Sequence, residues 1–203
     1  MIDGLLKDYI DPMWERMARP LARAGFSPNQ VTAMGLGLIV AASAGYLWHA
    51  SPLVYGLTLA IAFAFDALDG AVARQTGLSS KTGGYFDAMV DRYQELIVLM
   101  AIAQMTGHWA LALLAFSGAM LISYAKARTA IEIAISNTAW PDVFERLERI
   151  IYICAMLILA GITGSGWVMT GGLAVYAGLC HATALQRIGR AVALLRQADQ
   201  DRR

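Results

Sequence analysis

Long apolar stretches, separated by short polar breaks, dominate the chain. Six of them come close to the roughly 20 mostly apolar residues that a membrane-spanning helix needs, and they cover residues 29–49, 52–75, 84–105, 108–133, 145–163 and 166–195. Gly and Ser recur inside these stretches, as they do where membrane helices pack closely. The pattern predicts an all-α integral membrane protein with six transmembrane helices, which together form a bundle over residues 29–195.

The first 24 residues follow a different pattern. Apolar residues such as Leu5, Tyr9 and Met17 recur at helical spacing, while basic residues such as Lys7 and Arg16 occupy other positions. This pattern indicates an N-terminal amphipathic helix over residues 1–24 that lies in the membrane interface. A soluble helix packed on the rest of the chain is the alternative.

Composition agrees with a membrane protein. Of the 203 residues, 58% are hydrophobic and only 15% are charged, whereas a soluble domain carries about 25% charged residues. Cys154 and Cys180 fall inside apolar stretches, where cysteine acts as a small buried hydrophobe. Because no internal repeat or linker interrupts the pattern, we expect a single domain over residues 1–203.

The charges are segregated along the predicted bundle. The breaks near residues 50–52, 106–108 and 163–166 contain no Lys, Arg, Asp or Glu, so all 16 basic residues fall toward the opposite end. Basic residues stay on the cytoplasmic side of membrane proteins. We therefore expect a protein integral to the cytoplasmic membrane, with its N-terminus and its active site facing the cytoplasm and with no nucleic-acid partner.

Four aspartates stand out in this apolar chain. Asp66 and Asp69 are three residues apart near the inner end of the second predicted helix, so they share a face. Asp87 and Asp91 are four residues apart at the start of the third helix and also share a face. Because a short connection makes these helices antiparallel neighbours, the two pairs of carboxylates are expected to face each other across one cavity.

Four carboxylates this close repel one another, and burying them alone is costly. Divalent cations offset that cost, and oxygen-only ligands suit Mg²⁺, Mn²⁺ or Ca²⁺. Two such ions would balance four carboxylates and would bind phosphates. Small residues at Gly70, Ala73 and Gly83 leave room for a ligand beside the carboxylates, and Arg74 and Lys81 supply positive charge suited to phosphate.

Two other interpretations of the aspartates are open at this point. Carboxylates near helix ends can be solvated or paired with arginines, with no further role. Intramembrane carboxylates can also mark a cation pathway, which would make the protein a non-enzymatic carrier. A pathway predicts polar steps across the membrane, and the outer half offers only residues such as His49 and His108.

The spacing of these residues resembles the signature of the CDP-alcohol phosphotransferase family. The matching positions are Asp66-x-x-Asp69-Gly70-x-x-Ala73-Arg74, then eight residues, then Gly83-x-x-x-Asp87-x-x-x-Asp91. Six helices behind an interfacial helix are also similar to that family, so the resemblance covers nearly the whole chain. It implies a membrane enzyme that transfers a substituted phosphate from a CDP-linked donor, usually CDP-diacylglycerol, to an alcohol, with release of CMP.

The resemblance also implies roles for individual residues. Asp66, Asp69, Asp87 and Asp91 would bind the metal, as two Mg²⁺ or Mn²⁺ ions, and Asp91 would also be the general base. The residues implied to hold the CDP moiety are Asp69, Gly70, Ala73, Arg74 and Gly83. Asn29, at the start of the first helix, would either reach the nucleotide or cap that helix. The family likeness further implies a homodimer.

Cations on three other helices bear on the choice of alcohol. The fourth, fifth and sixth predicted helices carry such residues at their inner ends, namely Ser123, Lys126, Arg146, Arg149 and Arg187. A pocket of this kind suits an anionic, phosphorylated acceptor. The alternative is that these cations contact anionic lipid headgroups.

These stretches resemble the phosphatidylinositol phosphate synthase branch of the family, although Leu147 stands where that branch tends to carry proline. The resemblance implies that the acceptor is inositol 1-phosphate. Glycerol 3-phosphate is the next candidate and would make the protein a phosphatidylglycerophosphate synthase. Serine or another zwitterionic acceptor would need fewer cations and ranks third.

Overall fold

A computed structural model describes the backbone of residues 2–134 and 142–201 and the side chains of residues 12–134 and 142–201. The described residues are helical throughout, with turns between the helices and no strand. The helices are α1 (Ile2–Arg23), α2 (Pro28–His49), α3 (Pro52–Asp66), α4 (Leu68–Thr76), α5 (Lys81–Thr106), α6 (Trp109–Glu132), α7 (Arg146–Thr163) and α8 (Gly166–Asp201). The all-α prediction is therefore confirmed for this part of the chain.

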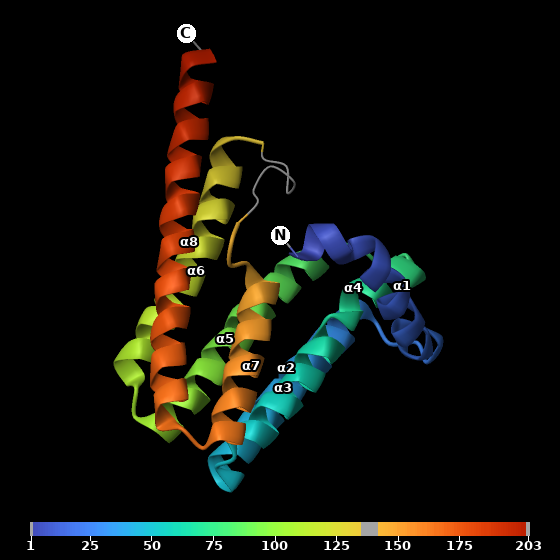
Figure 1. Ribbon diagram of the computed structural model, residues 1–203. Coiled ribbons are helices and arrows are strands. Elements are labelled where there is room, and N and C mark those ends of the chain that lie inside the picture. Colours follow the sequence, from blue (N-terminus) through green and yellow to red (C-terminus); the bar gives the residue numbers. More distant parts are fainter. Residues whose placement is uncertain (1, 135–141, 202–203) are drawn as a thin grey trace.

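The long helices run up and down beside one another (Figure 1). The turns that follow α2, α5 and α7 lie at one end of the bundle, and α1 and α4 lie at the other end. α8 extends beyond the bundle at that second end. The uncharged breaks of the sequence thus gather at one end, and the charged segments gather at the other.

Local sequence signals account for the helix ends. Ser27 caps α2, because its Oγ accepts from the backbone N–H of Gln30 while the Gln30 side chain accepts from the backbone N–H of Ser27, and Pro28 opens the helix. At their C-termini α5 and α7 end on Gly107 and Gly164, which take the left-handed conformation that glycine adopts without strain.

The second predicted helix differs from the expectation. It is not continuous over residues 52–75, because the chain turns at Ala67 between α3 and α4. Asp66 is the last residue of α3, and Asp69 lies in the first turn of α4. The two carboxylates therefore do not share one regular helix face; they lie on either side of a turn.

Close helix contacts form the core. A large apolar cluster joins α2, α3, α5, α6, α7 and α8, and a smaller one joins α1, α2 and α4 through Ala18, Val31 and Val72. A methyl group at Gly161 of α7 would lie 2.4 Å from the backbone N of Leu53 on α3, so only glycine allows this approach. Small residues thus serve helix packing, as the sequence pattern suggested.

Four helical stretches within the described residues have the length and composition to cross a membrane, namely α2, α3 with α4, α6 and α8. α5 and α7 are long enough to cross, but charged residues interrupt them, including Asp91 and Glu95 in α5 and Arg149 in α7. The count of six spans remains a prediction, as does the interfacial position of α1. The apolar side chains of residues 2–10, on which that position depends, lie outside the described side chains.

Candidate active site

The four aspartates of the signature gather where α3, α4 and α5 meet. Asp66 is 2% exposed and Asp91 is 9% exposed, whereas Asp69 and Asp87 are half-buried. Electrostatic repulsion couples Asp69 to Asp66 and Asp87, and it couples Asp91 to the same two residues. The sequence expectation that the two helices lie side by side is not met, because α5 packs against α2 and α6 rather than along α3 or α4. That the two pairs of carboxylates face one another across one cavity stays a prediction.

Neighbouring side chains hold the carboxylates in place. The Thr32 hydroxyl lies 2.6 Å from Asp69 Oδ2, and the Gln94 amide Nε2 donates to Asp66 Oδ1 at 2.7 Å. Neither Thr32 nor Gln94 was singled out from the sequence. Thr32 comes from another helix, but Gln94 follows Asp87 and Asp91 by one more turn of α5, so helical spacing could have identified it.

One arginine reaches into the carboxylates from α7. Arg146 Nη2 lies 3.0 Å from Asp66 Oδ2, 2.7 Å from Asp91 Oδ1 and 2.6 Å from Gln94 Oε1. The sequence analysis placed Arg146 with the acceptor cations and did not anticipate this contact. The separation of 80 residues between Arg146 and Asp66 explains why no local pattern signals it.

A cavity of about 170 Å³ opens beside Asp69 and Asp87. It is lined by α2, α4 and the start of α5 and includes five of the residues expected to face CDP, namely Asn29, Asp69, Gly70, Ala73 and Gly83. A methyl group at Gly70 would meet only Arg74 Nη1, at 3.7 Å, so it would occupy open space beside the chain. Arg74 itself is exposed and does not line this cavity.

A second cavity, of about 240 Å³, includes Arg92 and Arg146 in its lining, and both of these arginines contact Asp91. It is rich in arginine and includes four of the five residues expected to bind the acceptor, namely Ser123, Arg146, Arg149 and Arg187. Lys126 is half-buried on α6 and does not line it. Arg92 also lines it, contacts Ser123 and lies 3.5 Å from Asp91, although the sequence analysis had not singled it out.

Acidic residues balance the arginines of this second cavity. Arg149 donates from both Nε and Nη2 to Glu95 Oε1, at 2.9 and 2.6 Å, and Nη1 donates to the Phe144 carbonyl. Arg187 pairs with the fully buried Asp142 and donates to the Ile122 carbonyl at 2.7 Å. These contacts fix both guanidinium groups at the wall of the cavity.

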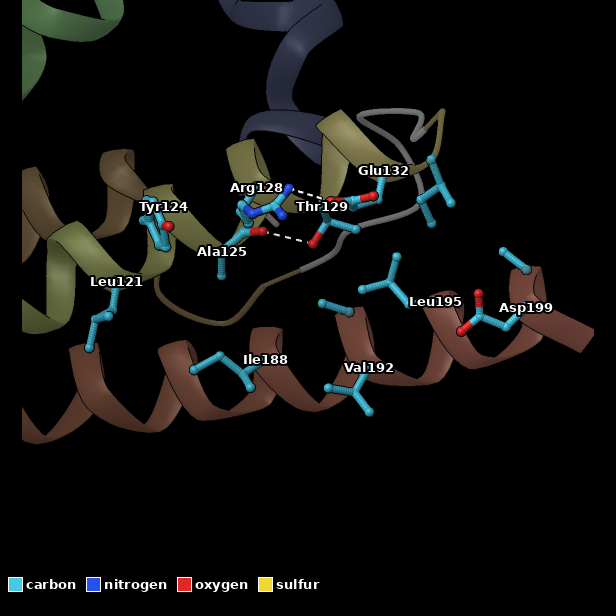
Figure 2. Close-up of a pocket in the computed structure, with 13 residues that line it drawn as sticks. Leu121, Tyr124, Ala125, Arg128, Thr129, Glu132, Ile188, Val192, Leu195 and Asp199 are labelled. Atoms are coloured by element: carbon cyan, nitrogen blue, oxygen red, sulfur yellow. Dashed lines mark hydrogen bonds and ion pairs between the residues drawn. The ribbon is translucent and has the colours of Figure 1, made fainter.

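A cavity larger than these two lies elsewhere. It is a groove of about 530 Å³ between α6 and α8, and Figure 2 shows the apolar side chains of Leu121, Ile188 and Val192 along it. Its polar contacts include the exposed ion pair of Arg128 with Glu132, at 2.6 Å. None of the predicted site residues lines this groove, so size alone does not identify the site.

The donor set of the aspartate cluster fits a hard divalent cation, because every donor is a carboxylate oxygen and two of the carboxylates are buried. As the side chains stand, no three acidic, His or Cys side chains among the described residues converge closely enough to surround an ion. The guanidinium of Arg146 contacts Asp66 and Asp91 instead. The chemistry of the site therefore suits metal ions in an arrangement that differs from this one.

Comparisons with known proteins place these features in a family. A sequence profile described as CDP-alcohol phosphatidyltransferase matches residues 26–180. The archaetidylinositol phosphate synthase of Pyrococcus horikoshii is 38% identical over 141 residues, which cover 68% of this chain and 73% of the relative. The enzyme of the same name from Methanothermobacter thermautotrophicus is 34% identical over 194 residues, which cover 91% of this chain and 89% of the relative.

Solved structures share the fold. The phosphatidylinositol phosphate synthase of Mycobacterium tuberculosis with bound CDP-DAG superposes with a TM-score of 0.77 at 23% identity, covering 89% of this chain and 94% of the other. A structure of the same enzyme with manganese and citrate gives a TM-score of 0.76 at 23% identity, with 88% of each chain covered. The profile match spans most of the chain and includes all four aspartates. The chain therefore belongs to the CDP-alcohol phosphatidyltransferase family.

Proposed function

We propose that the protein transfers the phosphatidyl group of CDP-diacylglycerol to the hydroxyl of inositol 1-phosphate, forms phosphatidylinositol phosphate and releases CMP. The observation that carries the proposal is a pair of cavities at the aspartate cluster, one lined by Asp69 and Asp87 and the other lined by Arg92 and Arg146, which contact Asp91. One is lined by signature residues, and the other is lined by four arginines, namely Arg92, Arg146, Arg149 and Arg187. The two relatives named archaetidylinositol phosphate synthase support an inositol phosphate as the acceptor.

In the proposed arrangement the CDP moiety occupies the first cavity. Gly70, Ala73 and Gly83 leave space for the nucleotide, and Asn29 lies beside Gly83, where its Oδ1 would be 3.4 Å from an added methyl group. Arg74, just outside the cavity, supplies positive charge for the pyrophosphate. The tails of the donor stay in the bilayer while its nucleotide stays at the cytoplasmic surface.

The acceptor occupies the second cavity, where Ser123, Arg149 and Arg187 receive its phosphate, with Lys126 at the edge. Glycerol 3-phosphate carries the same charged group but lacks the inositol ring. For this reason, glycerol 3-phosphate is the competitor that the test must include. Family membership gives no support to the cation-carrier alternative.

In the proposed arrangement the reacting atoms meet at Asp91, which contacts Arg92 and Arg146 of the second cavity. The acceptor hydroxyl oxygen forms a bond to the phosphorus that carries the lipid, the bond from that phosphorus to CMP breaks, and Asp91 takes the hydroxyl proton. Two Mg²⁺ or Mn²⁺ ions, held by Asp66, Asp69, Asp87 and Asp91, would neutralise the pyrophosphate and the leaving CMP. The protein acts at the cytoplasmic membrane as a homodimer. Its helix α1 lies in the interface between the membrane and the cytoplasm.

Purified protein in lipid, supplied with CDP-diacylglycerol and Mg²⁺ or Mn²⁺, tests the proposal. CMP release is expected with inositol 1-phosphate and is expected to be much slower with glycerol 3-phosphate, inositol or serine. A clear preference for glycerol 3-phosphate would show that glycerol 3-phosphate, and not inositol 1-phosphate, is the acceptor. No CMP release with any of the four alcohols would contradict the enzymatic function.

A further inference from the structure

Arg146 belongs to both halves of the site. Its side chain lines the arginine-rich cavity, and its Nη2 lies within 3.0 Å of both Asp66 Oδ2 and Asp91 Oδ1. The same nitrogen lies 2.6 Å from Gln94 Oε1. One guanidinium therefore contacts the carboxylates expected to bind metal while it faces the cavity expected to bind the acceptor.

A divalent ion on these carboxylates needs the oxygen atoms that Arg146 now contacts. Two buried carboxylates require a nearby cation, and either a guanidinium or a metal ion meets that requirement. The guanidinium and the metal ion repel each other, so each weakens the binding of the other to the same oxygen atoms. The described acidic residues do not surround an ion in the present arrangement, which fits a cluster closed by Arg146.

Arg146 also has more freedom than its neighbours. Its side chain is 27% exposed, whereas those of Arg149 and Arg187 are 2% and 5% exposed. Of these three arginines, Arg146 is the one that can turn away from the aspartates into the cavity that it already lines.

We propose that Arg146 is the internal counter-ion of the aspartate cluster and that a divalent metal displaces it into the arginine-rich cavity, where it helps to bind the anionic acceptor. The competition with metal depends on the contacts of Arg146 alone. Only the second step, binding of the acceptor, rests on the proposed function. Arg146 is thus the residue that couples the two binding events.

Coupling of this kind is reciprocal. If metal drives Arg146 toward the acceptor, the acceptor must strengthen metal binding by the same factor, and such factors are typically about 5- to 150-fold. A phosphate that holds Arg146 in the cavity leaves Asp66 and Asp91 available to the ion. Removing Arg146 should both tighten metal binding and abolish its dependence on the acceptor.

Manganese binding to the full-length protein in detergent or lipid discs, without CDP-diacylglycerol, tests the proposal. The paramagnetic resonance signal of free Mn²⁺ gives the affinity, and protein-free samples with the same phosphate correct for binding in solution. Arg146→Gln is expected to bind Mn²⁺ at least about fivefold more tightly than the wild type. Arg128→Gln, which removes an arginine from the exposed pair with Glu132, is the matched control and should leave the affinity unchanged.

Inositol 1-phosphate should tighten Mn²⁺ binding to the wild type and should have no effect on Arg146→Gln. Unchanged or weaker Mn²⁺ binding in Arg146→Gln would overturn the proposal. The wild type alone supplies a second test if that variant does not fold, because an acceptor that leaves Mn²⁺ affinity unaltered also contradicts the coupling.

The result separates this proposal from the proposed function. One outcome is tighter Mn²⁺ binding in Arg146→Gln together with a wild type that releases no CMP with inositol 1-phosphate. It would support competition between Arg146 and the metal and would contradict inositol 1-phosphate as the acceptor. The opposite outcome is CMP release by the wild type together with unaltered Mn²⁺ binding in the variant. It would support the proposed reaction and would contradict competition between Arg146 and the metal.

Discussion

Asp142 is a fully buried carboxylate that lies outside the family signature. It pairs with Arg187, and its Oδ1 lies 3.7 Å from Arg190 Nη1. Since Arg187 is itself buried, the carboxylate both neutralises that guanidinium and fixes its position at the wall of the arginine-rich cavity. Asp142 therefore positions Arg187 in the arginine-rich cavity.

Replacing Asp142 should affect folding and acceptor binding together. Asp142→Ala removes the buried carboxylate that pairs with a buried guanidinium, a change that costs about 3 kcal/mol in the free energy of unfolding. Displacement of Arg187 should raise KM for the phosphorylated acceptor and should leave KM for CDP-diacylglycerol nearly unchanged. Thermal unfolding in detergent and steady-state kinetics measure the two effects.

Asp199→Ala is the control for this substitution, because Asp199 is exposed on α8 and lines only the distant groove. It should match the wild type in both measurements. An Asp142→Ala protein with wild-type stability and acceptor KM would show that the buried pair does not position Arg187.

Asp91 is predicted to take the proton of the acceptor hydroxyl. Asp91→Asn keeps the shape of the side chain but removes its capacity to accept a proton, and the loss of a general base lowers kcat by about 100-fold or more. Release of CMP measures the effect. Glu132→Gln, an acidic residue in an exposed ion pair far from the site, should retain full turnover, and near-normal turnover in Asp91→Asn would remove Asp91 from this role.

At the scale of the helices, glycine sets how closely α2 approaches the aspartates. A methyl group at Gly35 would lie 2.6 Å from Asp66 Oδ1 and 3.1 Å from the Asp66 Cα. Gly37, two residues further along the same helix, has no atom within 4 Å of such a methyl group. Only the first of these glycines is needed to bring α2 against the site.

The two glycines provide a matched pair of substitutions. Gly35→Ala should force α2 away from α3, at a cost of about 2 kcal/mol in stability, and should lower kcat/KM because Asp66 moves. Gly37→Ala should leave kcat/KM unchanged and should not lower stability, because alanine favours a helix over glycine by about 0.5–1 kcal/mol. Unfolding curves and CMP release compare the two variants directly, and equal behaviour would mean that the close approach of Gly35 has no functional role.

Most helix ends were predicted to within three residues, because their signals are local, but α8 extends to Asp201, six residues beyond the predicted end at 195. Ser27 and Pro28 mark the start of α2, and a glycine follows the last residue of α5 and of α7. The turn at Ala67 had no such signal, since neither glycine nor proline marks it. Packing between helices distant in sequence decides that turn, so the local pattern could not predict it.

The same distinction separates the parts of the site. Asp87 and Asp91 were predictable, because a spacing of four residues within α5 places them on one helix face. The same reasoning fails for Asp66 and Asp69, because the turn at Ala67 separates them. The contact of Arg146 with Asp66 joins residues that are 80 positions apart. Charge attraction alone does not predict which of several carboxylates an arginine contacts. Resemblance to a family assigned Arg146 to the acceptor, and only the fold brings it to the aspartates as well.

For the molecule as a whole, charge segregation predicts the orientation in the membrane. Both cavities lie in the charged half, whereas the turns at the opposite end, including Ser165, carry no charged residue. Basic residues remain in the cytoplasm because moving them across the bilayer is unfavourable. The cavities should therefore face the cytoplasm.

Labelling of single introduced cysteines in intact cells tests this orientation. A membrane-impermeant maleimide should react with Ser165→Cys from outside, but it should react with Gln197→Cys, on the exposed end of α8, only after the membrane is opened. The wild type supplies the blank, because Cys154 and Cys180 are buried. The reverse order of labelling would place both cavities outside the cell, away from the cytoplasmic pool of nucleotides, and equal labelling of both positions in intact cells would contradict any single orientation.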